Sequence, residues 1–252
     1  MGPGRALGVT TTEMDRFPEL PPLEPDAVHV WMTDCAPESG HRPRLLAATT
    51  DAERERAARF HRREDGERFL VAHGTLRLLL AGYLRCDPLT LRFGAHANGK
   101  PFVEGARIHF NLSHSGALAL IAVARSRQVG VDVEEVRPMP DLDNVATRVC
   151  TPGELAVLTS LPEGERSRAF LAMWTRKEAL AKATGEGIGG IFRDGRHAPA
   201  DTHDGWTLIP VSDLPGYVAC VAAEGEGWHL VRRTVVMPAT ATTAPTDTNE
   251  TR

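Results

Sequence analysis

Apolar residues recur with helical spacing in two long stretches of the chain. These stretches are RFLVAHGTLRLLLAGYL at 68–84 and RAFLAMWTRKEALAKATG at 168–185. Apolar side chains at intervals of three and four residues put one face of a helix into a hydrophobic core. The pattern predicts a helical region over 51–84, with a break near 61–65, and a second long helix over 165–184.

Short extended segments bounded by turn residues separate and follow these helices. Turn signals such as Ala97-Asn98-Gly99 and Ser115-Gly116 stand between apolar runs of strand length. A further helix is predicted to start at Thr151, because TPGEL combines a threonine cap, a proline at the first helical position and a glutamate at the third. The predicted strands are 88–93, 106–111, 117–124, 128–135, 206–211, 217–223 and 227–236.

The two halves of the chain repeat the same order of elements. The helix at 68–84 resembles the one at 168–185, and SGALALIAVA resembles LPGYVACVAA at the same offset of about 100 residues. A duplicated unit of a helix and strands predicts an α+β fold with two similar lobes and a ligand cleft between them. The predicted parts are a flexible segment at 1–26, lobes at 27–127 and 128–236, and a disordered tail at 237–252.

Composition and charge narrow the class of protein. With 42% hydrophobic and 25% charged residues the chain is typical of a soluble globular protein, and a net charge of −4 favours neither nucleic acid nor an anionic membrane as a partner. Its four cysteines lack CxxC spacing and its ten histidines form no HExxH pattern, so neither a disulfide framework nor a zinc site is indicated. The chain shows no export signal and no run of about 18 apolar residues, so we expect a cytoplasmic protein.

Two carboxylates alternate with valines in the segment GVDVEEVRP at 130–138. In a strand, Val131 and Val133 share one face while Asp132 and Glu134 share the other. Two like charges side by side are ordinary on a solvated face and costly on a covered one, unless a cation draws them together. Both interpretations remain open on this segment alone.

The second long helix carries charged residues beside its apolar face. Phe170, Trp174 and Ala181 lie within a narrow arc, and Lys177 and Glu178 fall on the margins of that arc. These charges are compatible with a ligand site. They are equally compatible with a surface ion pair between Glu178 and the lysine four residues further on.

Other polar residues stand at turns and strand ends. Lys100, Ser113 and His114 suit phosphate oxygens there, although His114 would equally suit a hydrogen-bonded core position. The arginine-dense segment at 53–68 is typical of a salt-bridged exposed helix. One or two of its arginines would suit an anion, because the planar guanidinium grips a phosphate in two places.

Taken in order, GKP, FNLSHS, GVDVEEV and WTRKEALAKATGEGI resemble the 4′-phosphopantetheinyl transferase superfamily, specifically its larger, pseudo-dimeric Sfp type. The resemblance covers about residues 50–225, and its core is G-[VI]-D-[VI]-E followed about 40 residues later by W-x-x-K-E-[AS]-x-x-K. An ordered signature of this length is more specific than a single short motif. It implies two similar α+β halves with coenzyme A between them, in agreement with the repeat described above.

The resemblance implies a role for each matching residue. Asp132, Glu134 and Glu178 match the acidic triad that holds Mg²⁺, and a set of carboxylate oxygens suits this ion or Mn²⁺. Glu178 and Lys182 are the implied catalytic residues, and the base is Glu178, Lys182 or a metal-bound water. This chain has Glu53 where the family usually has a further basic residue, so Arg54 is the implied substitute. The implied coenzyme A contacts are Arg56, Arg68, Lys100, Pro101, Ser113, His114 and Lys177.

The implied reaction is attack by a serine hydroxyl of an acyl or peptidyl carrier protein on the β-phosphate of coenzyme A, with release of adenosine 3′,5′-bisphosphate. The expected clients are carrier domains of nonribosomal peptide or polyketide synthesis, and the enzyme is expected to be a monomer. The carrier is expected to dock on the segment 144–158, which includes Arg148. Two alternatives are a non-catalytic coenzyme A or nucleotide-binding protein and a metal-dependent phosphodiesterase. The complete acidic triad argues against a non-catalytic binding protein. The lack of ligands for a second metal ion argues against a phosphodiesterase.

Overall fold

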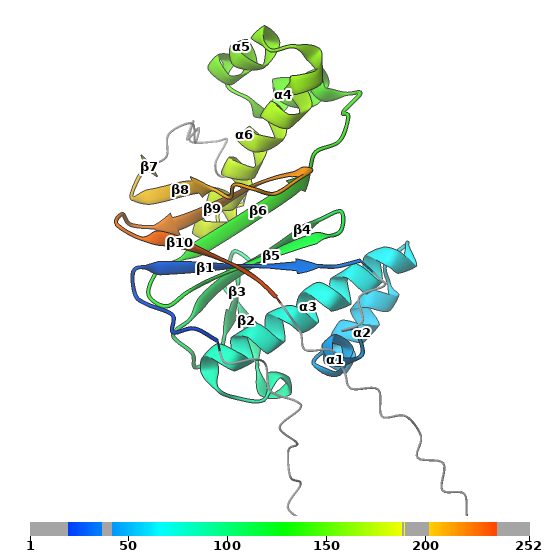
Figure 1. Cartoon of the computed structure of the whole chain (residues 1–252), viewed down its shortest axis with the longest axis vertical. Helices are drawn as coiled ribbons and strands as arrows, with labels where there is room; N and C mark the ends of the chain where they lie inside the picture. The colour runs from blue at the N-terminus through cyan, green and yellow to red at the C-terminus, as the bar shows by residue number, and fades with distance from the viewer. Residues whose placement is uncertain (1–19, 37–41, 188, 190–201, 236–252) are drawn as a thin grey trace, which may run out of the picture.

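The computed structural model describes residues 20–36, 42–187, 189 and 202–235, which form a mixed α+β fold (Figure 1). The predicted tail at 237–252 and most of the predicted flexible segment at 1–26 lie outside the described residues. In the N-terminal half the elements are β1 (Ala27–Asp34), α1 (Arg42–Ala47), α2 (Asp51–Ala58), α3 (Arg63–Leu84), the 3-10 turn η2 (Pro88–Thr90), β2 (Phe93–Ala95), β3 (Pro101–Val103), β4 (His109–Ser115) and β5 (Leu118–Ala124). In the C-terminal half they are β6 (Val129–Glu135), α4 (Leu142–Val149), α5 (Pro152–Ser160), α6 (Glu163–Thr184), β7 (Thr202–His203), β8 (Trp206–Pro210), β9 (Tyr217–Glu224) and β10 (His229–Thr234).

Three strands of each four-stranded sheet follow the same order and pairing. Their strand orders are β10-β1-β5-β4 and β6-β9-β8-β7, and β2 and β3 form a separate small ribbon. In the first sheet β1, β5 and β4 are antiparallel neighbours with α3 between β1 and β4 in sequence. In the second sheet β6, β9 and β8 repeat this arrangement with α6 between β6 and β8.

Strand β10 crosses from one half of the chain to the other. It lies within the predicted C-terminal lobe at 128–236, yet it pairs in parallel with β1 at the edge of the N-terminal sheet. The sequence pattern predicts this strand but not its partner. The N-terminal sheet is therefore completed by the end of the C-terminal half.

Apolar side chains pack the two sheets against each other and each sheet against its long helix. The core between the sheets is rich in valine and includes Val28 and Val30 of β1 and Val131 and Val133 of β6. Leucines of α3 cover the other face of the first sheet, and alanines of α6 cover the other face of the second. The order of layers is therefore α3, sheet, sheet, α6, as Figure 1 shows.

Local sequence signals explain the ends of several elements. The predicted break near 61–65 is confirmed, since α2 ends at Ala58 and α3 begins at Arg63. The predicted capping box at Thr151 is confirmed as well, because its side chain accepts a hydrogen bond from the backbone N–H of Glu154 and the Glu154 carboxylate accepts one from the backbone N–H of Thr151. Helix α6 ends at Gly185 in a left-handed conformation with φ 76°.

Some elements differ from the predictions. The predicted strand at 88–93 is wrong at its start, because Asp87 caps a 3-10 turn over Pro88–Thr90. The predicted strand at 106–111 begins only at His109 and runs on to Ser115. Strands β1, β3 and β7 and helices α1 and α4 have no counterpart among the predicted elements. No helix among the described residues combines the length and apolar character needed to cross a membrane.

Gly130 marks the closest approach of α6 to β6. A Cβ atom on this residue would lie 2.1 Å from the carbonyl oxygen of Ala179 and 2.4 Å from the backbone nitrogen of Ala183. Both neighbours are helix backbone, which cannot rotate aside. Glycine at this position therefore lets the helix rest on the strand that carries Asp132 and Glu134.

We predict that Gly130→Ala lowers the free energy of unfolding by about 3 kcal/mol or more, because overpacking against backbone forces helix and strand apart. Urea denaturation of the purified variant measures this cost. Gly153→Ala is a suitable control, since a Cβ at this helical position meets only Thr151 Oγ1, at 3.9 Å. Equal stability of the two variants would contradict the close packing at Gly130.

Trp174 is only partly buried. Its ring stacks on that of Phe170, with centroids 6.4 Å apart and planes at 19°. Full burial would make Trp174→Ala cost about 3 to 5 kcal/mol. With partial burial we predict a loss of about 1 to 3 kcal/mol, measured by the same denaturation experiment. Phe170→Ala, at a position that is only 3% exposed, should cost more.

Candidate active site

Strands β4 and β6 meet along a row of polar contacts at the junction of the two sheets. The Asn111 side chain accepts a hydrogen bond from the backbone N–H of Val131 at 2.9 Å. Ser113 donates to Asp132 at 2.8 Å, and Ser115 donates to Glu134 at 2.8 Å. Side chains of the N-terminal half thus hold the two carboxylates of the GVDVE segment in place.

Asp132 lies at the centre of this junction and is only 3% exposed. Its Oδ1 accepts hydrogen bonds from Lys182 Nζ at 2.6 Å and from Ser113 Oγ at 2.8 Å. Its Oδ2 is buried and has no hydrogen-bond partner among the residues that the structure describes. A buried carboxylate oxygen without a donor is costly, which makes Oδ2 a position suited to a cation.

Glu134 and Glu178 complete a cluster of acidic residues around Asp132. Burial raises the pKa of Glu134, and the charge of Asp132 raises it further. Burial likewise raises the pKa of Glu178, and the charges of Asp132 and Glu134 add to this effect although Lys182 opposes it. The three carboxylates are therefore close enough to repel one another.

Lys182 supplies the positive charge next to this cluster. It lies one turn beyond Glu178 on α6, and its ammonium donates to both Asp132 and Ser113. The described residues contain no group of three or more His, Cys, Asp or Glu side chains already arranged to hold a metal ion. The donor types, the raised pKa values of two glutamates and the unpaired Oδ2 nevertheless fit a hard divalent cation.

Lys177 differs from its predicted role as a coenzyme A contact. It is 1% exposed, and its ammonium donates to Glu154 at 2.6 Å and to the carbonyl of Val149 at 2.7 Å. Glu154 is the capping-box residue of α5. Lys177 therefore joins α6 to the α4–α5 helices and points away from the acidic cluster.

Lys100 and Pro101 lie at the predicted turn before β3. The Lys100 ammonium donates to the carbonyls of Val129 at 3.1 Å and of Ala183 at 2.6 Å. Burial lowers the pKa of Lys100 to about 8. This lysine thus bridges the two halves of the chain, and Pro101 beside it is exposed at the start of β3.

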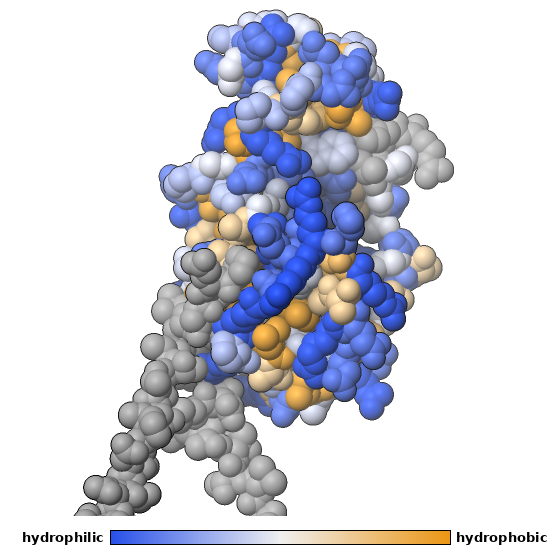
Figure 2. Space-filling model, turned by 90° about the vertical axis from the view of Figure 1, so that its right-hand side faces the viewer, coloured by the Kyte–Doolittle hydropathy of each residue, from blue (hydrophilic) through white to orange (hydrophobic). Residues whose placement is uncertain are grey.

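His114 is exposed on β4. Burial of part of its ring lowers the pKa of His114, and the charges of His73 and Lys182 lower it further. Asp65 and Arg68 of α3 also influence this pKa. Figure 2 shows the face of the molecule on which the β4–β5 turn and the start of α3 lie, with hydrophilic residues gathered along its middle.

The arginines of α2 and α3 make different contacts. Arg56 is exposed and lies over the ring of Phe69, 5.0 Å from its centroid. Arg68 pairs with Asp65 at 3.1 Å. Arg54 is engaged in holding the start of α2, where it donates to the carbonyls of Thr49 and Leu46. These contacts do not favour Arg54 as the substitute for the missing basic residue.

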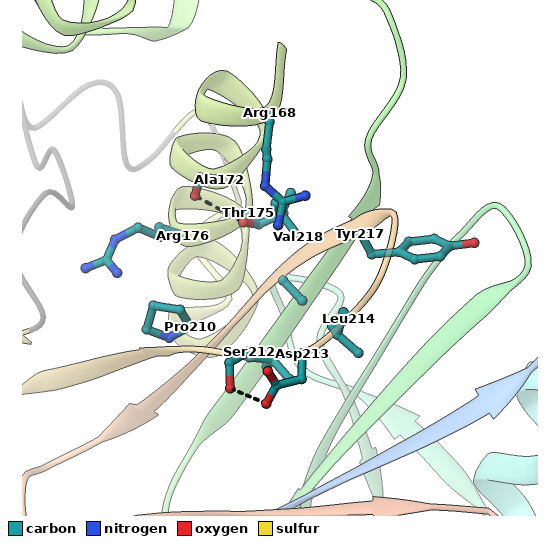
Figure 3. Close-up of a pocket in the computed structure, with 12 residues that line it drawn as sticks. Arg168, Ala172, Thr175, Arg176, Pro210, Ser212, Asp213, Leu214, Tyr217 and Val218 are labelled. Carbon is teal, nitrogen blue, oxygen red and sulfur yellow. Dashed lines mark hydrogen bonds between the residues drawn. The ribbon is translucent and has the colours of Figure 1, made fainter. Parts of the chain in front are cut away.

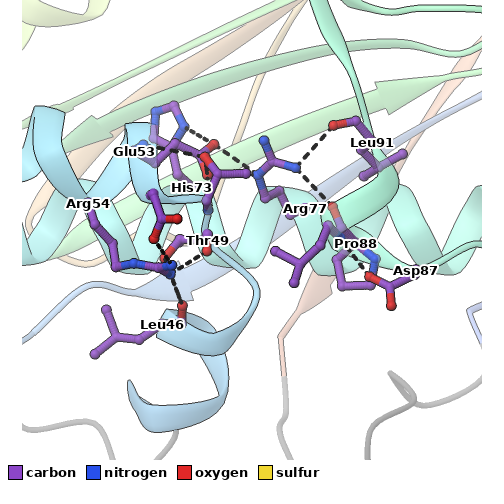
Figure 4. A network of polar contacts seen from close by, with 12 residues as sticks. Leu46, Thr49, Glu53, Arg54, His73, Arg77, Asp87, Pro88 and Leu91 are labelled. Carbon is purple, nitrogen blue, oxygen red and sulfur yellow. Dashed lines mark hydrogen bonds and ion pairs between the residues drawn. The ribbon is translucent and has the colours of Figure 1, made fainter. Parts of the chain in front are cut away.

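Glu53 belongs to a buried network that the sequence analysis did not predict (Figure 4). Arg77 Nε donates to both of its carboxylate oxygens, at 2.9 and 2.8 Å, and His73 Nδ1 lies 3.7 Å from Oε1. Arg77 also donates to the carbonyls of Pro88 and Leu91, which ties η2 to α3. The signal in the sequence was the acidic residue at a position where the resemblance implies a basic one.

A cavity of about 240 Å³ lies under the first half of α6 (Figure 3). Arg168, Thr175 and Arg176 line it from the helix, and Ser212, Leu214 and Val218 line it from the β8–β9 region. All its lining residues belong to the C-terminal half of the chain. Asp132, Glu134 and Glu178 are not among its lining residues, although Val218 pairs with Glu134 in the sheet.

Comparisons with known proteins cover both halves of the chain. Residues 128–221 match a family model described as the 4′-phosphopantetheinyl transferase superfamily, and residues 36–126 match one described as 4′-phosphopantetheinyl transferase, N-terminal. The chain is 37% identical to the 4′-phosphopantetheinyl transferase HetI of Nostoc sp. over 215 residues, which are 81% of this chain and 90% of that protein.

Two Bacillus subtilis proteins match over a shorter span. A 4′-phosphopantetheinyl transferase of this organism is 31% identical over 60% of this chain and 66% of its own length. The 4′-phosphopantetheinyl transferase Sfp is 29% identical over 58% of this chain and 64% of its own length.

Proposed function

The chain belongs to the 4′-phosphopantetheinyl transferase superfamily, and from this membership we propose that it moves the phosphopantetheine group of coenzyme A to a serine of a carrier protein. The observation that carries the proposal is the acidic cluster of Asp132, Glu134 and Glu178 beside Lys182. The cluster lies where β4 of one half meets β6 and α6 of the other. A ligand bound there contacts both halves.

Asp132, Glu134 and Glu178 are the residues that would hold Mg²⁺ or Mn²⁺. The bound ion would neutralise negative charge on the pyrophosphate of coenzyme A during transfer. The unpaired Oδ2 of Asp132 and the raised pKa values of both glutamates support this assignment. Carboxylates that repel one another gain most from a shared cation.

The reaction forms a bond between the serine oxygen and the β-phosphorus and breaks the bond from that phosphorus to the oxygen it shares with the α-phosphate. Adenosine 3′,5′-bisphosphate leaves with this oxygen, and the serine proton passes to a base. We assign the base to Glu178, because its raised pKa makes it a better proton acceptor than an ordinary carboxylate. Lys182, whose ammonium donates to Asp132 of the cluster, would stabilise the negative charge on the oxygens of the pyrophosphate.

The repeated topology supports an internal duplication with coenzyme A bound between the halves. Helix and strands follow the same order around α3 and α6. Lys100 and Ser113 of the first half reach residues of the second, as a shared binding site requires. His114, Arg68 and Arg56 stand on the N-terminal side of this junction, where they would meet phosphate groups.

The client proteins we propose are acyl or peptidyl carrier domains of polyketide or nonribosomal peptide synthesis, modified in the cytoplasm by a monomeric enzyme. Residues 144–158, which include Arg148, are our candidate docking segment. Helices α4 and α5 span most of this segment and stand at one end of the molecule (Figure 1).

Intact-mass spectrometry of apo carrier domains incubated with the protein, coenzyme A and Mg²⁺ tests the proposal. We expect the carrier to gain the mass of one phosphopantetheine, with equimolar release of adenosine 3′,5′-bisphosphate. Binding of coenzyme A without any gain in mass would favour a non-catalytic binding protein. Cleavage of coenzyme A without modification of any carrier would favour a phosphodiesterase.

A further inference from the structure

The cavity under the first half of α6 combines positive charge with apolar surface. Arg168 and Arg176 line it from the helix about two turns apart, with the small side chain of Ala172 between them. Leu214 and Val218 supply apolar surface from the β8–β9 region. The Arg168 side chain is exposed and extends along α6 (Figure 3). It makes no hydrogen bond and no ion pair with any residue that the structure describes, so its guanidinium is available to a ligand.

The acidic residue in the lining of this cavity is Asp213. Its carboxylate already lies 3.3 Å from Nη1 of Arg232 on β10, and it accepts a hydrogen bond from the Ser212 hydroxyl at 3.2 Å. The two arginines of α6 and this one carboxylate leave the lining with a net positive charge. The cavity therefore suits an acidic group, which a guanidinium binds through charge-assisted hydrogen bonds.

The cavity is small for a free ligand. Its volume of about 240 Å³ equals that of about eight molecules of liquid water, whereas pockets for small molecules typically measure about 300 to 1,000 Å³. A cavity of this size takes one long side chain of a protein partner. The pantetheine arm of coenzyme A is a less suitable occupant, because it carries no charge to pair with the arginines.

The cavity lies close to the acidic cluster. Val218 pairs with Glu134 in the sheet, so the two side chains lie on the same face of it. Thr175, which also lines the cavity, precedes Glu178 by about 4.5 Å along α6 and about 60° around it. The hydroxyl of Tyr217, another lining residue, accepts a hydrogen bond from the backbone of the β4–β5 turn at 3.2 Å. The cavity is therefore within about one helical turn of the cluster.

Building on the proposed function, we propose that this cavity receives an acidic side chain of the carrier protein while the carrier serine reaches the acidic cluster. Arg168 and Arg176 bind the carboxylate, and the apolar lining contacts the methylene groups that carry it. The carrier thus presents an Asp or Glu on its surface beside the serine that is modified. The cavity recognises the protein substrate, whereas the acidic cluster serves coenzyme A.

A docked carrier is large enough to reach the cavity. An interface of standard size covers about 800 Å² on each partner, which corresponds to a patch with a radius of about 16 Å. Arg168 precedes Glu178 by about 15 Å along the axis of α6. Val218 also packs in one core cluster with Leu142 of α4 and Leu158 of α5. The cavity therefore adjoins both the acidic cluster and the candidate docking segment.

Charge reversal at Arg168 tests this assignment. Arg168→Glu should raise KM for the apo carrier domain about tenfold and leave KM for coenzyme A unchanged, because a like charge then opposes the acidic side chain of the carrier. Arg168→Lys keeps the charge and should stay within about threefold of the wild type. Arg125→Glu makes the same charge reversal at an exposed position between β5 and β6 and should behave as the wild type.

Filling the cavity tests its apolar part without any change in charge. Ala172→Leu places a larger apolar side chain between the two arginines, at a helical position that leucine tolerates well. Calorimetry with a carrier domain whose modified serine is replaced by alanine should show binding weakened about tenfold. The melting temperature should stay close to that of the wild type, which separates loss of docking from loss of the fold.

A compensating change in the carrier identifies the pair of residues. Arginine in place of one acidic surface residue of the carrier should restore binding to Arg168→Glu and weaken binding to the wild type. Unchanged carrier binding in both Arg168→Glu and Ala172→Leu, or a loss confined to coenzyme A, would overturn the role of the cavity. Failure of the wild-type protein to modify any carrier would instead overturn the proposed function, and the role of the cavity with it.

Discussion

Replacing Asp132 by asparagine should lower kcat/KM for carrier modification by about 100-fold to 1,000-fold, the effect expected when several kcal/mol of charge stabilisation are lost. The change removes one negative charge at the centre of the acidic cluster and preserves the size of the side chain. Asparagine is preferable to alanine here, because Asp132 is buried against Lys182 and Ser113 and a smaller residue would leave both without their partner. We therefore expect the fold to remain intact.

Activity should be measured by the mass gain of a carrier domain across a titration of Mg²⁺, together with the melting temperature of each variant. Asp26→Asn is a matched control, since it makes the same chemical change at an exposed position before β1. We expect Asp26→Asn to behave as the wild type. Retention of more than roughly a tenth of the activity by Asp132→Asn at saturating Mg²⁺ would exclude Asp132 as a metal ligand.

Replacing Lys177 by methionine should lower the free energy of unfolding by about 3 to 5 kcal/mol, because it leaves the carboxylate of Glu154 buried without its cation. At this chain length the loss corresponds to a fall in melting temperature of about 6 to 20 °C. Lys177 is almost fully buried and Glu154 is nearly so, which makes their pair far more consequential than a surface salt bridge. Affinity for coenzyme A of the folded variant should not change.

The double variant Lys177→Met/Glu154→Gln separates the ion pair from packing. It should be more stable than Lys177→Met, because no uncompensated charge remains. Stability should be compared at neutral pH: Lys177 helps to lower the pKa of Glu154, so this contribution is present above the ordinary carboxyl pKa and is lost as pH falls through the folded-state value. Unchanged stability of Lys177→Met together with weaker binding of coenzyme A would restore the role implied by the resemblance.

The elements that were predicted are those with a local cause. The long helices follow from apolar spacing, the start of α5 from the capping box at Thr151, and the end of α6 from Gly185. Strand β1 was not predicted, because Ala27–Asp34 is buried on both faces and shows no alternation of polar and apolar residues. Its partners β5 and β10 are both distant from it in sequence, β5 in the middle of the chain and β10 in its last part.

The candidate site likewise contains residues that the sequence could identify and contacts that only the packing of distant elements decides. Residue types and order along the chain were sufficient to single out Asp132, Glu134, Glu178 and Lys182. The resemblance also gave Lys177 a contact with coenzyme A, and only the surrounding elements show that the Lys177 ammonium contacts Glu154 whereas that of Lys182 contacts Asp132. The Glu53–Arg77–His73 network was missed for a similar reason, since it joins α2, α3 and η2 through side chains alone.

By itself the amino-acid sequence determined the long helices, the start of α5, most of the longer strands and the identity of the acidic residues, because periodicity, capping and motif spacing act over a few neighbouring positions. The tertiary structure alone decided which strands pair, which lysine neutralises Asp132 and how Glu53 comes to hold His73. These contacts join residues that are distant along the chain, and they depend on how whole layers pack against one another.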